Sequence, residues 1–237
     1  MKLLLAHGWG ANHHSWDPIT ALLAPQAEVL APDLPGHGER AEESGLTIDR
    51  LVGDLAGQLD EPVVAIGHSM GGQVVARLAV QHPSLVQALV VIDPAYGADD
   101  AEMAGAPAVL ADLRTRGTAA GVDFVDRAFA GLENSPLHQQ ARAQMARTPG
   151  AVLADLYESM YLAHGSIGAR PATRAFLPTI HQPCLSLYST EHAATFARSI
   201  PWPPGSTITV WPGTTHYLHQ QHPHLFIDLL KTWLSTH

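Results

Sequence analysis

Short, unbroken apolar runs recur along the chain and constrain its fold more than any other feature of the sequence. Each run is four to six residues long, and most are bounded by glycine, proline or acidic residues. Continuous rather than alternating hydrophobicity is typical of strands buried on both faces, as in a parallel sheet covered by helices. The predicted strands cover residues 2–6, 28–31, 62–66, 88–92, 184–188 and 206–211.

Helical patterns separate the early strands at residues 14–23, 47–59 and 73–81, and a further amphipathic helix at 223–234 closes the chain. Strands that alternate with helices indicate an α/β architecture. We therefore predict an α/β fold in which a mostly parallel central sheet of about six strands is flanked by helices.

The segment between the fourth and fifth predicted strands contains no convincing strand. Its apolar residues instead follow helical spacing at 108–116, 122–130, 137–147 and 152–164, with glycines and prolines between these stretches. We interpret residues 95–170 as a helical cap inserted into a core formed by residues 1–94 and 171–237.

The composition excludes several classes of function. Thirteen basic residues against 22 acidic ones give a formal charge of −9, so no basic surface is expected for nucleic acid. The lone cysteine, Cys184, excludes an internal disulfide and fits a reducing compartment. The first apolar run is too short for a signal peptide, and no run approaches the roughly 20 residues of a membrane span. We expect a cytoplasmic protein without a membrane partner; no pattern indicates its oligomeric state.

A candidate nucleophile lies between the third strand and the next helix, in Gly67-His68-Ser69-Met70-Gly71. A serine between a strand and a helix must occupy a sharp, strained turn, and glycines two positions to either side remove the Cβ atoms that would clash there. The turn exposes the Ser69 hydroxyl at the positive end of the following helix.

A serine nucleophile also needs a base and donors for an oxyanion. The candidate base is His216, which follows the last predicted strand in Pro212-Gly213-Thr214-Thr215-His216. The candidate oxyanion donors are the backbone N–H groups of Met70, directly after the nucleophile, and of Trp9, after the first strand.

Four motifs together resemble those of the α/β-hydrolase superfamily, in particular its smaller, cap-bearing esterase and lactonase members. In chain order they are His7-Gly8-Trp9-Gly10, the turn at 32–38, the nucleophile turn at 67–72, and Gly213-x-x-His216. The resemblance implies a carboxylesterase-like serine hydrolase that uses no cofactor. It also implies that Asp33 and His37 shape a turn beside the site. Family members often begin with a β-hairpin, for which this chain has no room, and six strands rather than eight are therefore expected.

The acid that should orient the base is missing from the position where the family most often has it. In the turn after the fifth strand, the usual glycine is Ser189 and the usual acid is His192, while Glu191 lies one residue early. A minority of the superfamily takes its acid from the end of the preceding strand, where this chain has Asp93. We prefer Asp93 and keep Glu191 as the alternative.

Aromatic residues suggest what the site binds. The candidate substrate contacts are Trp9, His68, Tyr96, Phe124, Tyr157 and Tyr161, which favour a small molecule with an apolar or aromatic group. The insertion offers Arg114, Arg116 and Arg127 as possible anchors for an anionic group. The histidines near the C-terminus lack the spacing of a metal site, so no metal is expected.

Three hypotheses follow. The first is a serine hydrolase of carboxylic esters, thioesters or lactones that acts through an acyl-enzyme on Ser69. The second is a cofactor-independent dioxygenase of a heteroaromatic substrate, which the position of Asp93 and the His-Gly-Trp turn also resemble. The third is a non-catalytic member that binds a ligand in the same pocket.

Overall fold

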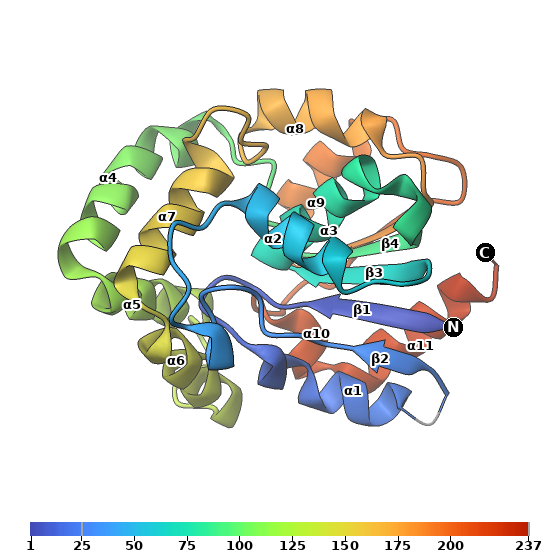
Figure 1. Cartoon of the computed structure of the whole chain (residues 1–237), viewed down its shortest axis with the longest axis horizontal. Helices are drawn as coiled ribbons and strands as arrows, with labels where there is room; N and C mark the ends of the chain where they lie inside the picture. The colour runs from blue at the N-terminus through green and yellow to red at the C-terminus, as the bar shows by residue number, and fades with distance from the viewer. Residues whose placement is uncertain (25, 237) are drawn as a thin grey trace.

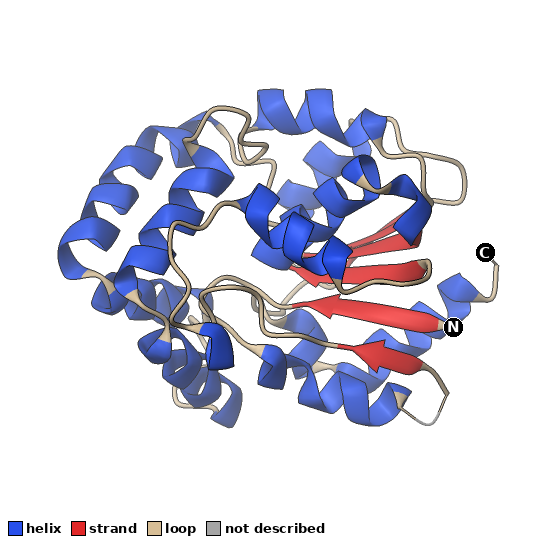
Figure 2. Cartoon of the chain, viewed as in Figure 1, coloured by secondary structure: helices blue, strands red, loops and turns tan. Residues whose placement is uncertain are grey.

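Six parallel strands form one central sheet within the residues that the computed structural model describes, 1–24 and 26–236. Their order across the sheet is β2-β1-β3-β4-β5-β6. The predicted α/β fold with a parallel sheet is therefore confirmed (Figure 2). The strands are β1 (Lys2–Ala6), β2 (Glu28–Leu30), β3 (Val63–His68), β4 (Val86–Ile92), β5 (Cys184–Tyr188) and β6 (Thr207–Val210).

Helices cover both faces of the sheet (Figure 1). One face carries α1 (Asp17–Leu23) and α11 (Pro223–Leu234), and the other carries α2 (Ile48–Gly57) and α3 (Met70–Gln81). Alternate residues of β1 divide between two buried clusters, with Leu4 in one and Leu5 in the other, because neighbouring side chains of a strand point to opposite faces. Burial on both faces explains why the strands read as unbroken apolar runs.

Within the described residues, the chain between β4 and β5 forms five α-helices, of which the first four lie beyond the carboxyl ends of the strands (Figure 1). Helix α4 begins at Asp100, eight residues earlier than predicted, because Asp99 and Glu102 form a reciprocal capping box at its start. The proposed cap insertion, 95–170, contains the first four of these helices. They are α4 (Asp100–Arg116), α5 (Thr118–Ala128), α6 (Pro136–Arg147) and α7 (Gly150–Tyr161), followed by α8 (Arg170–Phe176).

The two ends of this helical segment meet in a short backbone neck. Ala98 forms an isolated parallel bridge with Ala169. The N–H of Ala98 donates to the carbonyl of Gly168 at 2.9 Å, and the N–H of Arg170 donates to the carbonyl of Ala98 at 2.9 Å. The chain therefore leaves and re-enters the region of the sheet at one place.

The remaining elements complete the core. Helix α9 (Glu191–Arg198) follows β5, and the short α10 (Leu218–Gln221) precedes α11. Single 3-10 turns occupy His13–Trp16, Gly38–Arg40, Pro83–Leu85 and Leu177–Thr179. No helix within residues 1–24 and 26–236 is long and apolar enough to cross a membrane.

Candidate active site

Ser69 occupies the strained turn that its flanking glycines predict. Its backbone angles are φ 53° and ψ −117°, outside the regions that side-chain-bearing residues prefer. A Cβ atom on Gly67 would overlap the carbonyl of Gly71, and one on Gly71 would overlap the carbonyl of Ala6. The Ser69 N–H donates to the carbonyl of Ile92 at 2.9 Å, which ties the turn to the end of β4. Helix α3 starts at Met70 rather than at the predicted position 73, directly after this turn.

Asp93 and His216 lie within hydrogen-bond distance although 123 positions separate them in the chain. Nδ1 of His216 lies 2.8 Å from Oδ2 of Asp93. The same carboxylate accepts two hydrogen bonds from Ser189, one from its N–H to Oδ1 at 3.0 Å and one from its hydroxyl to Oδ2 at 2.7 Å. The Asp93 N–H donates to the carbonyl of Leu187 on β5 at 2.7 Å.

The contacts of Asp93 keep its side chain ionised. Burial by itself would raise the pKa of this carboxyl group, but the hydrogen bonds from His216 and Ser189 outweigh burial and hold the pKa below its usual value. A carboxylate that accepts from Nδ1 leaves Nε2 of the imidazole without its proton, and Nε2 is then free to accept one. The pair therefore has the orientation that a general base needs.

His68 packs against His216. It is buried, its ring centroid lies 4.7 Å from that of His216, and its Nε2 lies 2.9 Å from the His216 carbonyl oxygen. Burial is the main cause that lowers the pKa of His68 well below its usual value, and the neighbouring His219 and His216 lower it further. The neutral His68 ring therefore donates to that carbonyl and carries no charge beside the base.

The turn after β1 lies directly against the nucleophile turn. A Cβ on Gly8 would come within 3.4 Å of the Ser69 Cβ. The following residue, Trp9, is held by its indole N–H, which donates to the carbonyl of Leu153 at 3.1 Å. Met70 is the first residue of α3, so its N–H has no acceptor within the helix. Met70 thus follows Ser69 directly, and the turn that carries Trp9 lies against Ser69; the role of both residues as oxyanion donors remains a prediction.

A cavity of about 240 Å³ contains Ser69, Asp93 and His216 in its lining. Of the predicted substrate contacts, Tyr96, Phe124 and Tyr161 line this cavity, and Phe124 is 37% exposed at the surface. Three others lie outside the lining and form its support: Trp9, His68 and Tyr157. The Trp9 ring packs edge-on against that of Phe124, with their centroids 5.5 Å apart. The centroid of the Tyr157 ring lies 6.2 Å from that of Trp9.

Sequence reasoning assigned no role to several polar residues of this cavity, among them Ser189 and Arg170. In the sequence, Ser189 stands out only because the family usually has a glycine at this position. The candidate anchors of the insertion lie outside the lining, and two of them form ion pairs, Arg114 with Glu158 and Arg116 with Asp112 and Asp123.

The alternative acid, Glu191, does not reach the base in this structure. It is the first residue of α9 and forms an exposed ion pair with Arg198. The described residues contain no group of three or more histidine, cysteine, aspartate or glutamate side chains placed to hold a metal ion. Asp33, expected to shape a turn, accepts from the His13 and Glu39 N–H groups at 2.7 and 2.8 Å.

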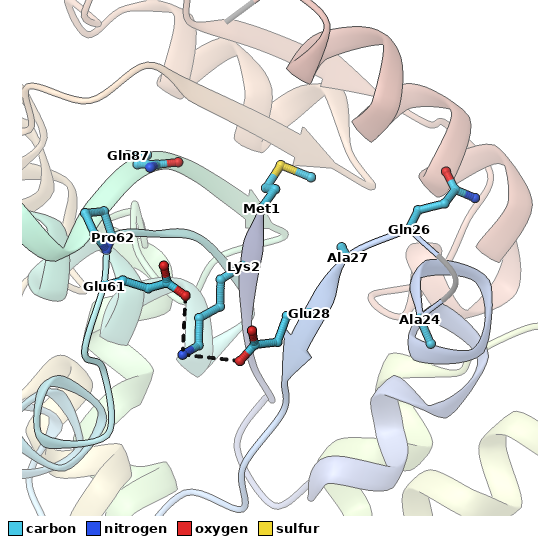
Figure 3. Close-up of a pocket in the computed structure, with 9 residues that line it drawn as sticks. All are labelled: Met1, Lys2, Ala24, Gln26, Ala27, Glu28, Glu61, Pro62 and Gln87. Carbon is cyan, nitrogen blue, oxygen red and sulfur yellow. Dashed lines mark ion pairs between the residues drawn. The ribbon is translucent and has the colours of Figure 1, made fainter.

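A larger cavity, of about 490 Å³, lies at the opposite, amino ends of the strands (Figure 3). Its one lysine, Lys2, is surrounded by carboxylates, with Nζ 3.3 Å from Glu28 and 3.7 Å from Glu61. None of the predicted site residues lines it. Its lysine is already paired with carboxylates, and the described residues that line it include no serine or histidine that could act as a nucleophile or base. Ser69 and its cavity therefore remain the candidate site.

Comparison with known proteins identifies the family. The model of the alpha/beta hydrolase family matches residues 3–229. The chain belongs to the α/β hydrolase family. This membership confirms the sequence-based resemblance and the prediction of a hydrolase-type enzyme.

Three proteins illustrate what the chain is similar to. The pimeloyl-[acyl-carrier protein] methyl ester esterase of Salmonella agona (strain SL483) is 27% identical over 244 aligned positions, which cover 99% of this chain and 94% of the relative. The enol-lactonase of Burkholderia xenovorans LB400 is 22% identical with a TM-score of 0.80. This match covers 99% of the present chain and 91% of the lactonase chain. The AqdC variant, which recognises the Pseudomonas quinolone signal and cleaves its ring, is 18% identical with a TM-score of 0.81. This match covers 100% of the present chain and 91% of that chain. The two structural likenesses show the shared fold.

Proposed function

We propose that this protein is a serine hydrolase of carboxylic esters, thioesters or lactones, with Ser69 as the nucleophile. One observation supports the proposal: the hydrogen-bonded pair of Asp93 and His216 lines the same cavity as Ser69. Ser69 itself lies in a strained turn at the carboxyl end of β3. Each partner has the chemistry that its role in acyl transfer requires.

The reaction would proceed in two stages. His216 accepts the proton of the Ser69 hydroxyl as its oxygen attacks the carbonyl carbon, and Asp93 stabilises the resulting imidazolium. The N–H groups of Trp9 and Met70 stabilise the oxyanion, and His216 then donates its proton to the leaving alcohol, or to the leaving thiol of a thioester. Water, deprotonated by His216, hydrolyses the acyl-enzyme and regenerates the serine.

The cavity indicates the kind of substrate. Its aromatic lining, with Tyr96, Phe124 and Tyr161, would contact an apolar or aromatic acyl or alcohol group. The volume of about 240 Å³ lies just below the usual range for sites that enclose drug-sized ligands, which suits a compact small molecule. The similarity to an acyl methyl ester esterase supports esters as the first substrates to test.

The decisive experiment compares Ser69→Ala with a matched control, Ser186→Ala. Ser186 is a buried serine on β5 that does not line the cavity. We expect turnover of p-nitrophenyl esters and labelling by a fluorophosphonate probe to disappear in Ser69→Ala and to persist in Ser186→Ala. Undiminished turnover in Ser69→Ala would refute the nucleophile. A wild-type protein that neither turns over esters nor reacts with the probe would instead favour a non-catalytic, ligand-binding role.

A second candidate function, cofactor-independent ring cleavage by O₂, is supported by the position of the acid. Asp93 follows β4, the arrangement that also suggested a dioxygenase from the sequence, and a ring-cleaving protein shares the fold. Oxygen uptake that depends on a heteroaromatic substrate would distinguish this reaction from hydrolysis, which consumes no O₂.

A further inference from the structure

Ser189 is the only residue besides the base whose side chain hydrogen-bonds to the carboxylate of Asp93 among the described residues. Its N–H and hydroxyl contact different oxygens: the N–H donates to Oδ1 at 3.0 Å and the hydroxyl to Oδ2 at 2.7 Å. Oδ2 is also the oxygen that faces Nδ1 of His216, at 2.8 Å. The hydroxyl and the base therefore share one acceptor atom.

The topology of the sheet brings this contact about. Strands β4 and β5 are parallel neighbours, and Ile92 pairs with Leu187 at the end of their ladder. Asp93 lies one residue after Ile92 and Ser189 lies two residues after Leu187, so both leave the same edge of the sheet close together. The Asp93 backbone has a φ of 42°, and its N–H is held by the Leu187 carbonyl, so the chain itself turns the carboxylate toward β5.

We propose that Ser189 is a positioning residue for the reaction: its hydroxyl fixes the rotation of the Asp93 carboxylate so that Oδ2 faces the Nδ1–H of His216. This inference rests on the proposed function, because it assigns Asp93 the role of the acid. Ser189 does not exchange protons with the substrate in this role.

The chemistry of the hydroxyl suits the task. A hydroxyl that donates to a carboxylate makes a short, charge-assisted hydrogen bond, which favours the ionised form of the acid. Without it, the carboxylate would keep only the backbone donor at Oδ1 besides His216 itself, and rotation about the Cβ–Cγ bond could move Oδ2 away from the base. His216 would then lose the partner that orients its ring and fixes its tautomer.

The experiment uses three variants of the full chain: Ser189→Ala, Ser189→Val and Ser189→Thr. Valine and threonine have the same shape, and only threonine keeps the hydroxyl. For ester hydrolysis we expect Ser189→Ala and Ser189→Val to lower kcat by about 10- to 100-fold, the effect of losing one hydrogen bond to a charged group. Ser189→Thr should restore most of the activity. KM should change little, because the lost interaction orients the base rather than the substrate.

A spectroscopic measurement separates positioning from substrate contact, since Ser189 also lines the cavity. The Nδ1–H of His216, hydrogen-bonded to a carboxylate, gives a downfield proton NMR resonance in the enzyme without substrate. We expect this resonance to shift or broaden in Ser189→Val and to be retained in Ser189→Thr, while the thermal unfolding midpoints of the two variants agree.

Two results would overturn the inference: wild-type kcat in Ser189→Ala, or equal losses in the valine and threonine variants. A separate control distinguishes these results from failure of the proposed function. If Ser69→Ala and Asp93→Asn are inactive while Ser189→Ala is fully active, only the role of Ser189 is wrong. If Ser69→Ala remains active, the proposed function itself is wrong.

Discussion

Replacing Asp93 by asparagine tests the site most sharply, because the substitution removes a charge and hardly changes the size of the side chain. The carboxylate accepts three hydrogen bonds, two at Oδ2 from His216 and Ser189 and one at Oδ1 from the Ser189 N–H. All three partners are donors, whereas an asparagine side chain offers one acceptor oxygen and one donor NH₂ group.

Either orientation of the new amide damages the site. With its NH₂ toward His216, the amide forces Nδ1 to accept and moves the imidazole proton to Nε2, where it blocks deprotonation of Ser69. With its oxygen toward His216, the NH₂ faces the Ser189 N–H, so this partly buried donor loses its acceptor at a cost of up to about 1–3 kcal/mol. In addition, no negative charge stabilises the imidazolium. We therefore expect kcat for ester hydrolysis to fall by about 10⁴-fold, as for the equivalent change in a serine protease triad.

The matched control is Glu191→Gln, which neutralises the alternative acid. Glu191 pairs with Arg198 on the exposed side of α9, so we expect its substitution to leave kcat within about twofold of the wild type, as for a surface position. Steady-state kinetics with a p-nitrophenyl ester, together with thermal unfolding of each variant, would measure both effects. A large loss in Glu191→Gln with nearly normal turnover in Asp93→Asn would refute the assignment of the acid.

Three further predictions concern the fold and the cavity. Gly71→Ala should destabilise the protein by more than about 3 kcal/mol in urea unfolding, because the added Cβ would overlap a backbone carbonyl. The control Gly53→Ala, whose Cβ would have nothing within 4 Å, should be neutral or stabilising by up to about 1 kcal/mol. Equal effects of the two substitutions would contradict the steric argument. Burial lowers the pKa of His7 to about 4, so the unfolded chain binds a proton at higher pH than the folded one. The free energy of unfolding should therefore fall as the pH drops from about 6.5 toward 4, and a pH-independent free energy would show that the ring is not buried in its neutral form. Phe124→Ala should raise KM for aromatic esters more than for acetate esters. Leu132 is similarly exposed but lies outside the cavity, so Leu132→Ala should leave KM for both kinds of ester unchanged. Equal changes in the two variants would argue against an aromatic wall at Phe124.

The strands and the order of the motifs were predictable because they depend on local pattern. A run such as 62–66 is apolar at every position since β3 is buried on both faces, and the turn at Ser69 follows from glycines two positions away. Boundaries were less accurate. Strand β3 continues to His68, and α3 begins at Met70, because the strained turn is a single residue.

The surroundings of the acid could not be predicted in the same way. Asp93 was favoured from its place at a strand end, and the structure brings it against His216. The contact with Ser189 joins residues 96 positions apart and depends on which strands are neighbours and in what register. The cavity wall depends on how helices pack: Phe124 lines the cavity, whereas Tyr157, equally aromatic in the sequence, does not.

The neck at Ala98 and Ala169 separates the length of the helical segment from the spacing of β4 and β5. Because the two backbones already hydrogen-bond to one another, a shorter, longer or foreign stretch of helices could replace the intervening residues without pulling β4 and β5 apart. The carboxylate at the end of β4 lies on the sheet side of this junction. Exchange of the helical segment between residues 98 and 169 should therefore change which molecules the cavity admits and leave the Asp93–His216 pair in place.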